Sequence, residues 1–154
     1  MKITDFLKQT SIVAELRARD KNAVLAELSA KIAESIPGVA AKDLERVLWE
    51  RERLESTGIA DGVAIPHGKM TSLNELLAAF GRSSEGVDFQ AIDGKPSQIF
   101  FVLVAPENSV GLHLKALARI SRLCKDPGFR SRLLLARDAA EIFRVIREED
   151  EKYA

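Results

Sequence analysis

Residues 99–105 read Ile-Phe-Phe-Val-Leu-Val-Ala and form the longest apolar run of the chain. Aromatic and β-branched residues dominate this run, and both kinds favour strands. A strand that is apolar on both faces usually lies in the middle of a sheet covered by helices. The run therefore predicts the central strand of an α/β domain, and it is far too short to span a bilayer.

Helical and extended patterns alternate on both sides of this run. Apolar residues at helical spacing, with Asp20 and Asp138 as caps, favour helices over 23–34, 42–55, a segment from about 109, 129–136 and a last segment from about 139. Short apolar stretches favour further strands over 11–16 and 76–82, and a glycine-interrupted strand or loop over 58–66. The alternation predicts one α/β domain, residues 1–154, with helices on both faces of a mixed sheet.

Composition excludes several classes of function. The chain has 154 residues, 46% of them hydrophobic, with 23 basic and 23 acidic residues. Such a balance provides no basic field for nucleic acid and no attraction to anionic membranes. The N-terminus has no long apolar segment of the signal-peptide type. The single cysteine, Cys124, excludes an intrachain disulfide and a cysteine-cluster metal site, and the simplest location is a reducing cytoplasm.

A glycine-rich segment, residues 56–69, departs from these ordinary patterns. It reads Ser-Thr-Gly-Ile-Ala-Asp-Gly-Val-Ala-Ile-Pro-His-Gly-Lys. Proline is restricted to the edges, ends or bulges of sheets, so we expect Ile65 to close a strand and Pro66 to steer the chain away from it. His67 would then stand at the rim of the sheet, beside a glycine that leaves the imidazole accessible.

The second histidine, His113, is expected in the first turn of the helix that follows the central strand. It shares a helical stripe with Leu117, Ile120 and Cys124. Ligand sites in α/β sheets favour the carboxyl ends of strands. Both histidines are predicted at such ends.

Two imidazoles, the Arg51 guanidinium and the hydroxyls of Ser56 and Thr57 suit chemistry on a phosphoryl group. A neutral imidazole is a good nucleophile near pH 7, and a phosphoryl oxygen needs donors aimed at it. Each residue type also has a simpler interpretation. A histidine on an apolar stripe is often part of a core, Arg51 lies in a charged run, and Ser-Thr after a helix often forms a turn. A metal site is weakly supported, because the two histidines are far apart in sequence and no carboxylate has a fixed spacing to them.

The segment 56–69 resembles the active-site signature of the fructose/mannitol-type EIIA domains of the bacterial phosphoenolpyruvate-dependent phosphotransferase system. The resemblance continues upstream to residues 50–52 and downstream through 89–94, the strand 99–105 and the segment 106–114. It thus covers essentially the whole chain. The family fold is a three-layer α/β/α sandwich around a mixed, mostly parallel sheet.

The resemblance implies a role for each candidate residue. His67 matches the histidine that is phosphorylated, His113 the second active-site histidine, and Arg51 the arginine that neutralises charge during transfer. Ser56 and Thr57 match small residues near the site and are expected to contact phosphate. The implied phosphoryl donor is an HPr-like (NPr) carrier, and neither a metal nor an organic cofactor is implied.

Three functions remain open. Ser-Thr-Gly at 56–58 and the lack of fused transporter segments favour the nitrogen-related EIIA group, whose phosphorylation state controls binding to a regulated target protein. A stand-alone sugar EIIA that passes phosphate to an EIIB domain would have the same catalytic residues. The third alternative is a binding module that keeps the fold without carrying phosphate.

Overall fold

The computed structural model describes residues 1–153, which surround one five-stranded sheet. Its middle strand, β5 (Ser97–Pro106), is buried at every position except the half-buried Gln98. Aliphatic and aromatic side chains project from both faces of β5, and those on each face pack in a separate apolar cluster. The prediction of a central strand at 99–105 is confirmed.

The sheet is mixed. On one side β5 pairs antiparallel with β4 (Leu77–Val87), and β4 pairs parallel with β1 (Ile12–Val13). On the other side β5 pairs parallel with β2 (Val63–Ala64) and with β3 (His67–Met70). Three of the four strand pairings in the described chain are therefore parallel. The first strand is shorter than the expected 11–16, because the 3-10 turn η2 (Gln9–Ser11) includes Ser11 and the chain bends at residues 14–15, directly after Val13.

The expectation that Pro66 steers the chain off the sheet is wrong. Val63 pairs with Ile99 and His67 pairs with Leu103, so β2 and β3 keep one register along β5. Pro66 supplies no N–H to the ladder. Its carbonyl nevertheless accepts a hydrogen bond from the Leu103 N–H at 3.0 Å. Pro66 therefore interrupts the edge strand without ending it, and His67 stands on the edge of the sheet rather than beyond its rim.

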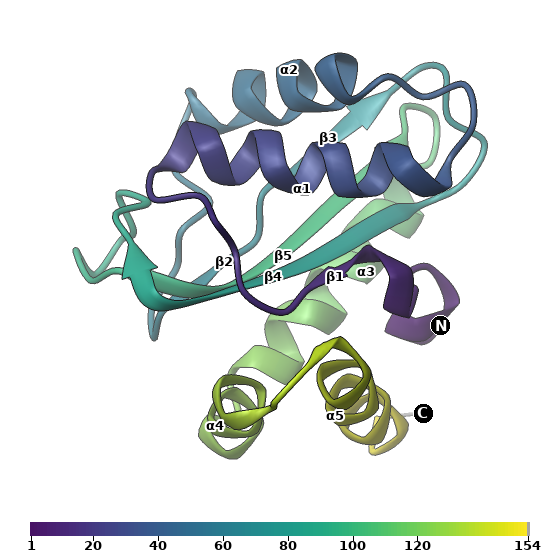
Figure 1. Cartoon of the computed structure of the whole chain (residues 1–154). Helices are drawn as coiled ribbons and strands as arrows, with labels where there is room; N and C mark the ends of the chain where they lie inside the picture. The colour runs from purple at the N-terminus through teal and green to yellow at the C-terminus, as the bar shows by residue number, and fades with distance from the viewer. Residues whose placement is uncertain (154) are drawn as a thin grey trace.

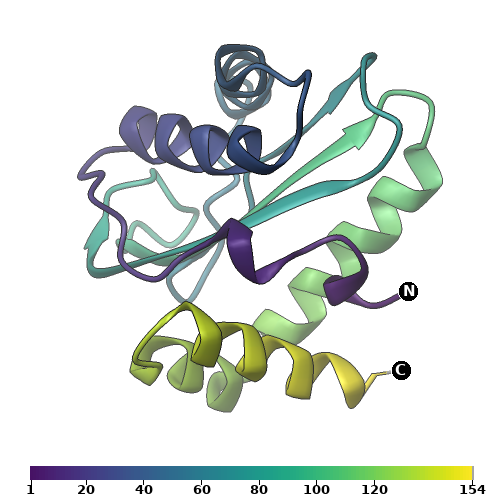
Figure 2. The same cartoon turned by 45° about the vertical axis from the view of Figure 1, so that its right-hand side comes forward.

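Helices cover both faces, as predicted. One face carries α1 (Lys21–Ser35) and α2 (Ala41–Glu52), and the other carries α3 (Val110–Cys124), α4 (Pro127–Leu135) and α5 (Ala139–Glu151) (Figures 1 and 2). The fold is thus an α/β/α sandwich. The expected caps are present, because the side chains of Asp20 and Asp138 accept hydrogen bonds from Ala23 N–H and Glu141 N–H.

The C-terminal helix is fastened to α3 and to the first turn of the chain, η1 (Ile3–Asp5). Arg119 on α3 donates to the buried Asp150 carboxylate at 2.6 Å, and the Thr4 N–H approaches the same carboxylate at 3.3 Å. Figures 1 and 2 both show the two ends of the chain on the same side of the molecule. Within residues 1–153 there is no helix with the length and apolar character that crossing a membrane requires.

We predict that stability depends strongly on β5. Phe101→Ala removes a fully buried ring that contacts Phe80 edge-on at 4.9 Å between centroids, and it should lower the free energy of unfolding by about 3–5 kcal/mol. Ile92→Ala, at a position that is 76% exposed, should change it by less than about 0.5 kcal/mol. Urea unfolding of the two variants checks this, and equal effects would contradict the central role of β5.

Candidate functional site

The structure brings His67, His113 and Arg51 together at one cavity of about 470 Å³. Each comes from a different layer: His67 from edge strand β3, Arg51 from the last turn of α2, and His113 from the first turn of α3. Because β3 lies at the edge of the sheet, helices on opposite faces reach the same space around it. Exposed apolar residues of α3 and the end of α2 complete the wall, including Leu54 and Leu114.

His67 is held in one orientation and, in its neutral form, in one tautomer. Its Nδ1 lies 2.8 Å from the carbonyl oxygen of Ile65. A carbonyl only accepts, so Nδ1 carries the hydrogen and donates it. In the neutral imidazole this leaves the lone pair on Nε2. The ring therefore lines the cavity in a fixed orientation, and Nε2 is the nitrogen with the free lone pair.

His113 is 4% exposed and its Nε2 has no hydrogen-bond partner among the described residues. Its ring stands at 76° to that of His67, with 5.5 Å between the centroids. Buried polar nitrogens are normally paired, and an unpaired one is costly. The unpaired nitrogen belongs to a ring that lies next to His67. It indicates a group prepared to bond a ligand rather than a satisfied core histidine.

Both imidazoles are kept neutral. Burial lowers the pKa of His113 to about 4, and the charges on His67 and Lys69 act in the same direction. Burial is also the main cause of the lowered pKa of His67, to which Arg51 contributes, while the bond to Ile65 and the charge of Glu52 oppose it. A neutral ring near pH 7 is the form that attacks phosphorus.

Arg51 brings positive charge to the cavity without being buried. The residue is half-buried, and its guanidinium Nη1 donates to the carbonyl oxygen of Glu55 at 2.8 Å. That bond uses one of five N–H donors, so the others remain available for an anion. The alternative interpretation, a purely solvated helix face, does not account for its position beside both histidines.

Ser56 and Thr57 do not line this cavity. The Ser56 hydroxyl donates to the Phe89 carbonyl at 2.7 Å, and the Thr57 hydroxyl donates to the Glu52 carboxylate at 2.7 Å. The Thr57 N–H lies 2.9 Å from each oxygen of that carboxylate. The geometry does not support the predicted phosphate contacts, and both residues instead bind the end of α2 to the segment before β2.

Sequence reasoning missed two residues near the site. Glu52 is a buried carboxylate that accepts a hydrogen bond from Thr57 and also pairs with Lys21 at 3.2 Å. The short spacing between Glu52 and Thr57 was the only sequence signal of the bond between those two residues. Lys69 is exposed, lines the cavity and follows His67 by two residues in β3, so strand alternation places both on one face. That alternation could have identified Lys69.

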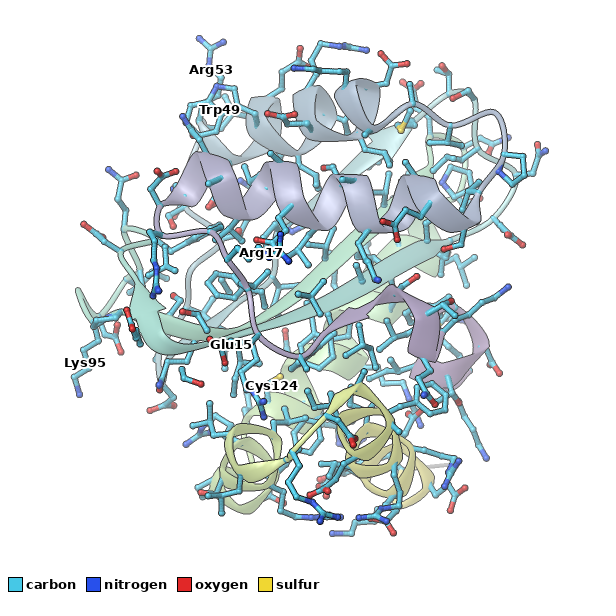
Figure 3. All side chains as sticks on the ribbon, in the orientation of Figure 1. Glu15, Arg17, Trp49, Arg53, Lys95 and Cys124 are labelled. Atoms are coloured by element: carbon cyan, nitrogen blue, oxygen red, sulfur yellow. The ribbon has the colours of Figure 1, made fainter. Side chains whose placement is uncertain are left out.

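Other groups are poor candidates for chemistry. Cys124 lies beneath the sheet next to α4, and burial raises the pKa of its thiol to about 12, in agreement with its interpretation as a small buried hydrophobe (Figure 3). A second cavity of about 330 Å³ between α1 and α2 is lined by Trp49, Arg46 and neighbours and contains no histidine. Residues 1–153 contain no group of three potential metal-binding side chains.

The chain is similar to known proteins both in sequence and in structure. The sequence model of the family described as "Phosphoenolpyruvate-dependent sugar phosphotransferase system, EIIA 2" matches residues 5–149. A "Nitrogen regulatory protein" of Bradyrhizobium diazoefficiens is 40% identical over 146 residues, 95% of either chain. A "PTS system fructose-specific EIIABC component" of Bacillus subtilis is 33% identical over 97% of this chain, which spans 24% of that protein. The crystal structure of nitrogen regulatory protein IIA-Ntr from Neisseria meningitidis superposes with a TM-score of 0.88, at 31% identity, over 94% of this chain and 98% of that one.

We predict that the hydrogen bond from Thr57 to Glu52 stabilises the fold. Thr57→Val keeps the shape of the side chain but removes a donor from a buried carboxylate, so it should lower the free energy of unfolding by about 1–3 kcal/mol. Ser84→Ala removes a similar hydroxyl bond to Glu15 on the surface and should cost less than about 1 kcal/mol. Denaturant unfolding measures both changes, and an unchanged stability of Thr57→Val would contradict a stabilising bond between Thr57 and Glu52.

The electrostatic coupling between Arg51 and His67 is also testable. Arg51→Gln removes a positive charge that lowers the pKa of His67, so that pKa should rise. Titration of the ring by ¹⁵N NMR measures the shift. Arg53→Gln is the matched control, because Arg53 projects from the same end of α2 into solvent (Figure 3) and should leave the pKa of His67 where it is. Equal shifts in both variants would contradict a local effect of Arg51.

Proposed function

The chain belongs to the EIIA 2 family of the phosphoenolpyruvate-dependent sugar phosphotransferase system, and from that premise we propose that His67 accepts the phosphoryl group and that its phosphorylation regulates the binding of other proteins. The observation that carries this proposal is the bond from His67 Nδ1 to the Ile65 carbonyl. It leaves Nε2 unprotonated inside a cavity that also holds Arg51 and His113. The phosphorylated atom is therefore Nε2.

The proposed transfer moves one phosphoryl group between two imidazole rings. The Nε2 lone pair of His67 attacks the phosphorus of a phosphohistidine on an HPr-like (NPr) carrier. A new N–P bond forms and the N–P bond to the donor breaks. The donor ring carries a hydrogen on its other nitrogen, so it keeps that electron pair and leaves as a neutral imidazole, while His67 retains the hydrogen on Nδ1. Three oxygens carry the negative charge of the phosphoryl group throughout, so the site has to supply donors rather than a base.

The donors come from both faces of the sheet. Arg51 can pair with two phosphoryl oxygens because its guanidinium is a planar fork. The unpaired Nε2 of His113 can donate to a third oxygen when that nitrogen carries the hydrogen. Lys69 adds a further positive charge at the rim. Together these groups would hold the charge of the transferred group without a metal.

The partner surface is the apolar rim of the cavity. Val110, Leu114 and Leu54 line the cavity and are 48–80% exposed. Leu112, which is 41% exposed, lies in the same first turn of α3 as Val110. Such residues suit a protein partner, whose interface centre is apolar and poor in charge. Met70, in the same strand as His67, is only 8% exposed and packs in the core, so it is not part of this surface. A phosphoryl group on His67 adds nearly two negative charges beside this rim, about 1.5 to 2 at pH 7.

A regulatory output is favoured over sugar uptake. The relative with 40% identity and the superposed solved structure are both named as nitrogen regulatory proteins. The second candidate, transfer to an EIIB domain, is favoured by the fructose-specific relative, in which this region is about a quarter of a longer chain. The same proposal takes residues 1–154 as one domain that acts in the cytoplasm.

The deciding experiment is a phosphotransfer assay with labelled phosphoenolpyruvate, enzyme I and an HPr- or NPr-type carrier. We expect acid-labile label on the wild type and none on His67→Ala. His113→Gln should still take label, but about 10²–10³-fold more slowly, because it loses one donor to the developing charge. Circular dichroism of each variant confirms that it is folded.

Each outcome has a distinct meaning. Label on His67→Ala would overturn the assignment of the acceptor. A wild type that takes no label from either carrier would favour a binding module on the same fold. Transfer of the label onward to an EIIB domain would favour the sugar branch, whereas partner binding that changes with phosphorylation would favour regulation.

A further inference from the structure

Gly68 follows His67 directly in β3 and faces the opposite side of the strand. Successive residues of a strand alternate between its faces. Gly68 and Met70 are buried, and Met70 packs in the cluster that contains Leu44 and Leu48 of α2, whereas His67 and Lys69 are more exposed. Gly68 thus lies beneath α2, and Figure 1 shows that helix over β3.

There is no room for a side chain at this position. A Cβ atom built on Gly68 would lie 2.5 Å from Cγ1 of Val47 and 3.3 Å from the Val47 carbonyl oxygen. The backbone itself would accept one, because the φ angle of Gly68 is not in the left-handed region. The obstacle is therefore the closeness of α2 and not the conformation of β3.

Val47 and Arg51 are one helical turn apart on α2 and line the same cavity. The separation of α2 from β3 at Val47 consequently sets how far the Arg51 guanidinium extends toward His67. Val47 cannot easily turn away, because a β-branched side chain in a helix has one strongly preferred rotamer. The hydrogen bonds from the Thr57 N–H and hydroxyl to the Glu52 carboxylate also fix the end of the helix.

We infer that Gly68 is a positioning residue for phosphoryl transfer: its missing side chain allows α2 to pack so closely on β3 that Arg51 reaches the group on His67. This inference rests on the proposed function. A methyl group at 68 would push apart the two elements that carry Arg51 and His67, and displacements of about 1 Å can cost 10²-fold in rate.

A double-mutant cycle tests the inference with its own internal control. Gly68→Ala should slow labelling of the protein by about ten- to a hundredfold in the wild-type background. In a Val47→Ala background the 2.5 Å contact is gone, and the same Gly68→Ala change should slow labelling by no more than about threefold. Equal losses in both backgrounds would overturn the inference.

Two further measurements separate positioning from loss of fold. Thermal unfolding and the fluorescence of Trp49, the only tryptophan of the chain and a residue of α2, report whether each variant is folded. The pKa of His67 reports the proximity of Arg51, and it should rise in Gly68→Ala and return in the double variant to the value of Val47→Ala. A folded Gly68→Ala protein with a wild-type pKa at His67 would contradict the displacement.

The NMR titration needs no phosphoryl donor, so it tests the displacement of Arg51 from His67 even if the wild type takes no label. In that case the proposed function fails while the packing of Gly68 under α2 is still judged by the pKa of His67. If the wild type takes label and the cycle shows no coupling, the function stands and the positioning role fails.

Discussion

The common register in which β2 and β3 pair parallel with β5, on both sides of Pro66, is the constraint on which the site depends. It places His67 opposite Leu103, on the outermost track of the sheet. At that edge no further strand separates the two layers of helices, so Arg51 from α2 and His113 from α3 approach the same imidazole. An equivalent histidine on a central strand would be accessible from one face alone.

Burial and backbone geometry together prepare the chemistry. The Ile65 carbonyl orients the His67 ring, and burial keeps both imidazoles neutral. The nearby positive charges, Arg51 and Lys69, oppose protonation of the rings. In the proposed transfer the same charges would attract the phosphoryl oxygens.

The polar residues around α2 have structural tasks that their sequence pattern conceals. Ser56 and Thr57 resemble phosphate ligands by their hydroxyls, yet their bonds go to Phe89 and Glu52. The network anchors the end of the helix that carries Arg51. Gly68, in the strand beneath the same helix, allows it to approach β3. The position of Arg51 thus depends on residues whose side chains offer no donor to the cavity.

Local patterns were sufficient for the central strand, the helix caps at Asp20 and Asp138, and the assignment of His67 and His113 as candidates, because apolar periodicity and capping chemistry act over a few residues. The continuation of the edge strand through Pro66, the hydroxyl bonds of Thr57 to Glu52 and the meeting of Arg51 with both histidines were decided by tertiary structure. Each depends on which segments of distant sequence pack side by side. Spacing along the chain does not carry that information, because the register of a strand and the depth of a helix are set by the surfaces they meet.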